Sequence, residues 1–386
     1  MLRGGEGGRI GTVANGTRTH LTLYLTGSYV LLIIYASLYP LADWHDSGGD
    51  PSSFLGATWP RYYTGFDLAT NLIAYLPFGF LCAAAWRRQL APLPAWLLTA
   101  LLGSALSLSM ELLQNYLPNR VPSNLDLACN ATGAMLGGWL GALWGARVLD
   151  QGRLAGLRRR LMTNGYGVDI GVLLVAAWLI CQLSPESLLF GSGNLRQMLD
   201  LPPVQPFLAE RFVDLETFIA AAGLLAAGLV ISMLLRRHAR ALTLGLLLGA
   251  LLIKTATHAL LMGPAAALGW ITPGNSLGIG IGLVLWWSAS FLSFPPQRAV
   301  ASLALLLTTV MVNVAPENPY LQNMLQIWNP GQFLNFNGLT RLICSLWPFL
   351  VLPWLMIYRP RKNEPDYFYV NEYLRRLDRN IAKEII

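Results

Sequence analysis

Charged residues are scarce in this chain of 386 residues, which is 12% Asp, Glu, Lys and Arg and 54% hydrophobic. Soluble globular proteins carry about 25% charged residues, so the composition excludes an ordinary soluble domain. The mean hydropathy of +0.47 indicates an integral membrane protein. In such a protein the formal net charge of +7 mostly reflects loop orientation, and we expect no nucleic-acid partner.

Cysteine is also rare, and no two cysteines form a C-x-x-C pair. All four lie in or beside apolar runs, and the four histidines are scattered. This pattern predicts neither a disulfide framework nor a zinc site. The sequence also lacks a Walker A motif, a G-x-S-x-G motif and an H-E-x-x-H motif. We therefore expect no metal and no cofactor, while whether the protein is an enzyme stays open.

Long apolar runs dominate what is present. The first 20 residues are polar and Gly-rich, and the run after them has no A-x-A-like cleavage site, which indicates a retained span. Since a span needs about 20 mostly apolar residues, the sequence predicts an all-α, polytopic membrane helical bundle with ten transmembrane helices. The predicted ranges are 21–40, 67–86, 93–113, 126–146, 168–188, 214–235, 241–262, 275–294, 299–315 and 338–358.

Lysine and arginine predict the orientation of this bundle. With the N-terminus inside, 21 of the 27 basic residues fall in cytoplasmic segments, four fall in outer loops, and Lys254 and Arg341 fall in spans. Cytoplasmic loops of membrane proteins carry an excess of Lys and Arg. The bias therefore favours an N-in, C-in topology, which requires an even number of spans.

Polar side chains gather at three helix ends that this topology brings to the outer face. Each of three spans presents two of them, three or four residues apart and thus on one helix face. Charges near hydrocarbon usually face a bundle interior or a wet cavity, so we expect one cluster. Its members, predicted to bind substrate, are Asp67, Asn71, Glu111, Gln114, Arg120, Asp126 and Asn130.

The same cluster also has structural interpretations. Arg120 could hold Glu111 and Asp126 as a bidentate ion pair that fixes the hairpin. Asp67 and Asp126 stand at predicted helix N-termini, where a carboxylate is favoured. Below the cluster, glycines four apart (Gly133, Gly137, Gly141 and Gly145) predict close helix packing in lipid. Pro77 is expected to kink the second span.

Three ordered blocks in this region, "DLATNLIAYLPFGF", "ELLQNYLPNR" and "DLACNATGAMLG", resemble the VanZ-like family over about residues 21–149. The resemblance implies a multi-pass protein of the bacterial cell (inner) membrane and cell envelope, of a family whose namesake is linked to teicoplanin resistance. The polar positions of the family fall on Asn71, Glu111, Gln114, Arg120, Asp126 and Asn130. The six further spans depart from a compact four-span VanZ-like protein.

These further spans echo the first four. "LLIIYASLYP" at 31–40 resembles "VAAWLICQLSP" at 175–185, and the Gly-rich fourth span resembles 273–287, with glycines again four apart. We interpret spans 1–4 and 5–8 as parallel repeats. The second copy lacks the polar set and instead carries Lys254 and His258 on one helix face. They are either interfacial groups or additional substrate-binding residues that complement the acids of the first copy.

The resulting organisation has five parts. Residues 1–20 form a cytoplasmic segment, 21–149 a VanZ-like four-helix domain, 150–298 a degenerate second four-helix repeat, 299–358 two further helices, and 359–386 a basic amphipathic tail. Residues 189–212 and 316–336 are predicted outer loops.

Three functions fit this organisation. The first is a protein that recognises or carries a lipid-linked envelope precursor, or an anionic lipid or glycan, with Arg120 binding a phosphate or carboxylate. The second is a membrane enzyme acting on such a lipid, with Glu111 or Asp126 as general acid or base. The third is a scaffold for envelope-biosynthesis partners, with a purely structural cluster. Membrane lipids are expected partners in every case.

Overall fold

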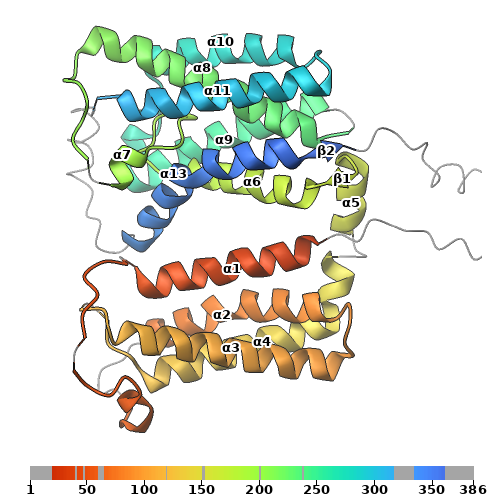
Figure 1. Ribbon diagram of the computed structural model, residues 1–386, viewed down its shortest axis with the longest axis vertical. Coiled ribbons are helices and arrows are strands. Elements are labelled where there is room, and N and C mark those ends of the chain that lie inside the picture. Colours follow the sequence, from red (N-terminus) through yellow and green to blue (C-terminus); the bar gives the residue numbers. More distant parts are fainter. Residues whose placement is uncertain are drawn as a thin grey trace, which may run out of the picture.

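Long helices lie at each of the ten predicted ranges. The computed structural model describes residues 20–39, 41–46, 48–59, 65–118, 120–149, 153–199, 201–236, 239–316 and 334–360. The N-terminal segment, most of the loop 316–336 and nearly all of the C-terminal tail lie outside these residues. The helices form two bundles stacked side by side, with α1 lying next to α6 and α13 (Figure 1).

The first bundle consists of α1 (Leu21–Leu38), α2 (Gly65–Trp86), α3 (Pro92–Gln114) and α4 (Asn124–Leu149). Pro92 stands at the first position of α3, where its missing N–H is tolerated. Helix α2 continues through Pro77. The most extensive contact of the bundle joins α2 to α4, and α1 and α3 pack around this pair.

Glycines make the contact between α2 and α4 possible. A methyl group added at Gly133, Gly137 or Gly141 would overlap the carbonyl oxygens of Leu72, Leu76 and Phe80, respectively. The backbones of the two helices therefore touch directly. This confirms the packing role predicted for these glycines.

The second bundle is built around α8. In the most apolar 18-residue stretch of α8, 72% is buried, against 33% in that of α2. Most of its core residues form one large cluster that includes Trp178, Trp286 and Trp347, and a smaller cluster contains Ile219 and Val312. The elements after α4 are α5 (Arg153–Leu161), β1 (Gly165–Tyr166), α6 (Val168–Cys181), α7 (Leu195–Met198), α8 (Ala209–Leu234), α9 (Ala239–Met262), α10 (Pro273–Ala289), α11 (Phe294–Val314), α13 (Leu334–Ile357) and β2 (Arg359–Pro360).

The contact between α8 and α10 repeats the geometry of α2 and α4. Glycines 274, 278 and 282 lie against the carbonyl oxygens of residues 213, 217 and 221. In the first bundle, glycines 133, 137 and 141 lie against carbonyls 72, 76 and 80, so all six pairs are 61 residues apart. The helices of the two bundles also start at similar intervals along the chain. Helices α1, α2, α3 and α4 start at 21, 65, 92 and 124, and α6, α8, α9 and α10 start at 168, 209, 239 and 273.

Helix α6 is shorter than the predicted span of 168–188. It ends at Cys181, shortly before Pro185, a residue type that disfavours helical backbone in the residue before it. Residues 182–194 then run through the second bundle without forming a helix. Leu189 and Phe190 are each only 2% exposed, and the Phe190 ring stacks on Trp178. Part of the predicted outer loop 189–212 is therefore buried.

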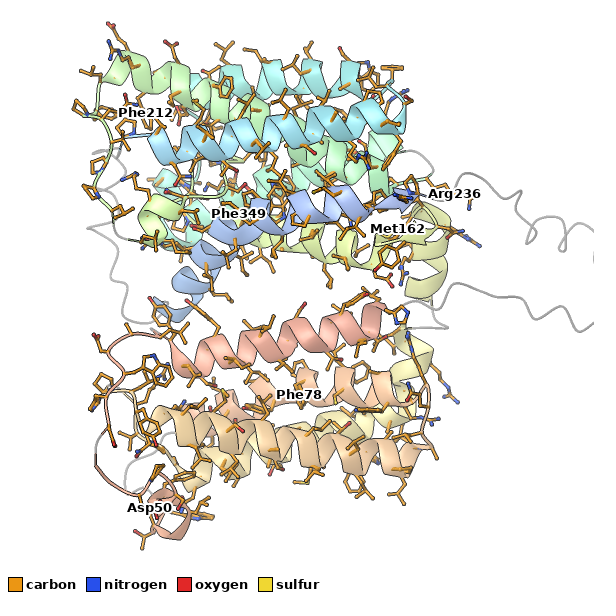
Figure 2. The ribbon with its side chains drawn as sticks, viewed as in Figure 1. Asp50, Phe78, Met162, Phe212, Arg236 and Phe349 are labelled. Carbon is orange, nitrogen blue, oxygen red and sulfur yellow. The ribbon has the colours of Figure 1, made fainter. Side chains whose placement is uncertain are left out.

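The two ends of the bundles differ in charge. The start of α1 and the end of α13 lie at the same end, together with Arg236 and Met162, and we call this the basic end (Figures 1 and 2). Asp50 and Phe212 lie at the opposite end, which we call the far end (Figure 2). At the basic end, Asp169 of α6 accepts a hydrogen bond from the backbone N–H of His20 (2.7 Å) and forms an ion pair with Arg158.

Seven of the described helices are long and apolar enough to cross a membrane: α1, α2, α3, α8, α9, α11 and α13. Helix α6 is a shorter apolar helix of 14 residues, and α4 and α10 fall outside this set of seven. The chain is thus a multi-pass, all-α membrane protein. The count of ten spans stays a prediction.

Candidate functional site

The predicted polar cluster assembles at the far end of the first bundle, where α2 begins, α3 ends and α4 begins. Ser123 precedes α4, and its hydroxyl oxygen accepts hydrogen bonds from the backbone N–H groups of Leu125 (3.2 Å) and Asp126 (3.3 Å). Its own N–H donates to Glu111 Oε2 at 2.8 Å. Ser123 therefore caps α4 and fixes the carboxylate of α3 beside it.

Glu111 is the most deeply buried acid of the cluster, at 3% exposure. The carboxylate interacts electrostatically with Asp126 and with Arg120. Buried charge in a membrane protein is costly unless it is compensated. The site thus brings together three of the four charged groups that the sequence singled out.

Asp126 links α4 to α2. Its Oδ1 accepts a hydrogen bond of 2.6 Å from Asn71 Nδ2, directly above the glycine contact between these helices. Asp67 lies one turn before Asn71 in α2, but its side chain is outside the part of the chain that the structure describes.

Asn130 lies one turn below Asp126, and its Nδ2 donates to Ser107 Oγ of α3 at 3.0 Å. Asn130 is 7% exposed, and its Oδ1 has no hydrogen-bond partner among the described residues. A buried amide oxygen without a partner is unfavourable. This part of the cluster therefore retains an unused hydrogen-bond acceptor.

Arg120 and Gln114 connect the cluster to α1. Arg120 Nη2 donates to the carbonyl oxygens of Ala36 (3.2 Å) and Tyr39 (3.3 Å), and Gln114 Nε2 donates to the carbonyl of Ser37 (2.9 Å). Within the described residues, the hydrogen bonds of Arg120 do not go to the carboxylates. The bidentate ion pair considered from the sequence is therefore wrong. The guanidinium binds these carbonyls because the end of α1 leaves them without helical hydrogen-bond partners.

Lys254 and His258 belong to a different region. Lys254 is 2% exposed and donates to oxygen atoms of Ser184 and Ser187, within the second bundle. His258 is 4% exposed, and neither ring nitrogen has a hydrogen-bond partner in the described part of the chain. Lys254 is therefore not a snorkelling interfacial residue.

The second bundle has its own polar contact at the far end. Glu216 of α8 accepts hydrogen bonds from Thr272 Oγ1 (2.5 Å) and Asn275 Nδ2 (3.0 Å) at the start of α10. Like the contact between Asn71 and Asp126, it joins the paired helices toward the far end, with the Glu216 carboxylate beside Gly274. Glu216 is buried and holds both partners, which fits a structural role.

Sequence reasoning missed Ser107, Ser123 and Glu216. Ser123 carries the standard signal of a residue that caps a helix, since it directly precedes the apolar fourth span. Ser107 stands four residues before Glu111 and so shares its helix face. Glu216 lies two residues after the start of the predicted span 214–235, and its charge close to hydrocarbon is the signal that could have found it.

A comparison with known protein families matches the first bundle. Residues 21–145 match the VanZ/LLP1 family. This part of the chain is VanZ-like. The match covers about a third of the 386 residues and contains the whole polar cluster. No curated protein and no solved structure matches the chain.

Proposed function

We propose that this VanZ-like protein recognises or carries an anionic amphiphile of the bacterial cell envelope, such as a lipid-linked sugar precursor. The polar cluster of the first bundle would bind the headgroup at the outer face of the inner membrane. Apolar faces of the helices would accompany the lipid tails. A link to glycopeptide resistance of the teicoplanin type would follow if the ligand is a cell-wall precursor.

The observation that carries this proposal is the hydrogen bonding of Arg120. Its Nη2 donates to the Ala36 and Tyr39 carbonyls, while Nη1 and Nε have no hydrogen-bond partner among the described residues. Arg120 is partly exposed. A guanidinium held at one nitrogen presents its other donors in a fixed orientation, which suits a phosphate or carboxylate.

The neighbouring groups suit the rest of a glycan headgroup. Glu111 and Asp126 are acceptors for hydroxyl groups, and Asn130 Oδ1 is an acceptor without a partner. The polar contact of the second bundle also leaves an amide oxygen, Asn275 Oδ1, without a partner among the described residues, so this feature does not by itself mark a site. The combination of such acceptors with the donors of Arg120 supports recognition of an anionic, polyhydroxyl ligand over pinning of helices.

The distribution of basic residues supports the orientation that this proposal needs. Arg236 lies at the opposite end of the helices from the polar cluster (Figure 2). With the positive-inside rule, we propose ten spans, N-in and C-in, with the cluster outside. Reporter fusions after Arg88, Arg160 and Arg240 should then read cytoplasmic, and an external reading at two of these sites would contradict the orientation.

Binding of defined lipids to the purified protein tests the ligand. We expect a polyprenyl diphosphate to raise the melting temperature of the wild-type protein in detergent, and phosphatidylcholine to have no effect. Phosphatidylglycerol is the anionic control: a shift with polyprenyl diphosphate but not with phosphatidylglycerol indicates recognition of the headgroup beyond its negative charge. Arg120→Gln should remove the shift, while Arg211→Gln, an exposed arginine in the first turn of α8, should retain it.

The other two functions are outcomes of the same test. Conversion of the added lipid, detected by mass spectrometry and lost in Glu111→Gln, would indicate the enzyme. Absence of any lipid effect, combined with strong destabilisation by Arg120→Gln, would indicate the scaffold and overturn the proposal.

A further inference from the structure

The non-helical segment 182–194 is the least expected feature of the second bundle. Its Phe190 carbonyl lies against Gly223, where an added methyl group would overlap it. Gly223 is close to the middle of α8, which at 1.5 Å per residue is about 39 Å long. Irregular backbone at such depth is tolerated only where protein or water satisfies its polar groups. Something must therefore satisfy the carbonyls of this segment.

Lys254 of α9 meets this requirement. Its Nζ donates to the carbonyl oxygens of Ser184 (2.7 Å) and Ser187 (2.8 Å) and to Ser187 Oγ (3.2 Å). These three oxygens match the three donors of an ammonium group. None of them belongs to a carboxylate, so all three hydrogen bonds of the ammonium go to neutral groups.

We propose that Ser184 and Ser187 form a monovalent-cation site in the interrupted segment, and that the Lys254 ammonium occupies this site as a tethered cation. Unwound backbone carbonyls at membrane depth are a recurring ligand set for monovalent cations. The distances of 2.7–3.2 Å exceed the 2.3–2.6 Å of calcium–oxygen contacts and suit a larger, singly charged group.

Several titratable groups surround Lys254 without being its hydrogen-bond partners. The groups that interact with it electrostatically are Cys181 from α6, Cys344 from α13, Glu186 from the segment itself and His258 from α9. The Glu186 carboxylate, which accepts a hydrogen bond from Gln197 Nε2 at 3.2 Å, favours the charged form of Lys254. The segment therefore holds the ammonium with three hydrogen bonds and contributes one nearby negative charge.

Salt dependence of stability tests this proposal in Lys254→Ala, which removes the tethered ammonium and leaves room for a free ion. In detergent, potassium or methylammonium chloride should raise its melting temperature by several degrees relative to choline chloride at equal ionic strength. The wild type and Leu260→Ala, an exposed position on the same helix, should show no such difference. Lys254→Met, which fills the space without charge, should be destabilised and insensitive to the cation.

Two results would overturn the proposal: a folded Lys254→Ala protein whose melting is the same in all three salts, or a Lys254→Met protein as stable as the wild type. If neither variant can be purified, hydrogen exchange of Ser187→Ala decides. This variant keeps both carbonyls and removes the hydroxyl ligand together with its hydrogen bond to the Ser184 carbonyl (3.1 Å), so Ser187→Cys, which keeps a weak donor, is compared with it. Faster exchange confined to residues 182–194 supports the cation site, and unchanged exchange contradicts it.

Discussion

The two bundles share one way of packing helices and differ in what they place above it. In both, three glycines of one helix lie against carbonyls of another, 61 residues earlier in the chain. In the first bundle, the polar groups near this contact include Arg120, whose described hydrogen bonds use only Nη2, and Asn130, whose Oδ1 has no partner among the described residues. In the second, Glu216 is buried and bonded to both Thr272 and Asn275, and the Oδ1 of Asn275 likewise has no partner in the described part of the chain.

This difference suggests a division of roles between two bundles of similar architecture. The second bundle has the larger core and the more deeply buried central helix. Its polar contact at the far end stabilises the helices. The first bundle has a smaller core, and its polar cluster includes an arginine that the contact at Glu216 lacks.

Substitution of the shared glycines should have the largest effect in both bundles. Gly137→Leu and Gly278→Leu would push side chains into backbone, since even a methyl group at Gly278 would lie 2.6 Å from the Thr217 carbonyl. Because backbone atoms cannot change rotamer to relieve the overlap, the loss in free energy of unfolding should exceed the about 1–3 kcal/mol typical of overpacking. We expect no monodisperse protein in fluorescence-detected size-exclusion chromatography.

Gly280→Leu is the matched control for this prediction. Gly280 lies on α10 between the contacting glycines, and an added methyl group there would meet nothing within 4 Å. If Gly280→Leu also gave no monodisperse protein, α10 would not tolerate leucine at either position, and the close-contact explanation would fail.

An intermediate effect should separate the two polar contacts between paired helices. Glu216→Ala leaves buried donors of Thr272 and Asn275 with fewer acceptors, which should lower the free energy of unfolding by about 1–3 kcal/mol. Asn71→Ala removes one hydrogen bond at a less buried position, and an interhelical hydrogen bond in a membrane is worth about 0.6 kcal/mol on average. Thermal denaturation in detergent should rank Glu216→Ala as the less stable protein; the reverse order would refute the division of roles.

The smallest effect on stability is expected for Glu111→Gln and Arg120→Lys. Gln keeps an oxygen that can accept from the Ser123 N–H, and Lys keeps a positive charge near the carbonyls at the end of α1. Both should melt close to the wild type but lose the lipid-induced shift, since Lys lacks the planar fork of donors. Simultaneous loss of stability and binding would favour the scaffold.

Hydropathy and glycine spacing were sufficient to predict the helices and their closest contact. The range 93–113 became α3 at Pro92–Gln114, and the glycines from 133 to 141 contact α2 as expected. Hydropathy and glycine spacing can be read from the residue itself, because an apolar or a small side chain favours burial or close packing whichever helix lies beside it. The polar residues could likewise be assigned to one end of the bundle, since the rise per residue of a helix gives the depth of each residue along it.

The partners of the polar residues could not be predicted. Arg120 bonds to backbone carbonyls of α1, about 80 residues earlier in the chain. Any residue type provides a carbonyl, so no side-chain pattern indicates it. Lys254 has the same property, because its partners are largely carbonyls of Ser184 and Ser187. The end of α6 could have been predicted, because Cys181 is followed by Gln-Leu-Ser-Pro-Glu-Ser before apolar residues resume at Leu188. A predicted span of about 20 residues extended the helix across this polar interruption.

A structure determined in lipid extracted directly from the native membrane would test the central claim most directly. We predict density for a lipid headgroup at the far end of the first bundle, with an anionic group within hydrogen-bond distance of Arg120 Nη1 or Nε and hydroxyl groups near Glu111. A structure in which protein carbonyls bind all the Arg120 donors, and side chains fill the space between Glu111, Asp126 and Asn130, would contradict the account.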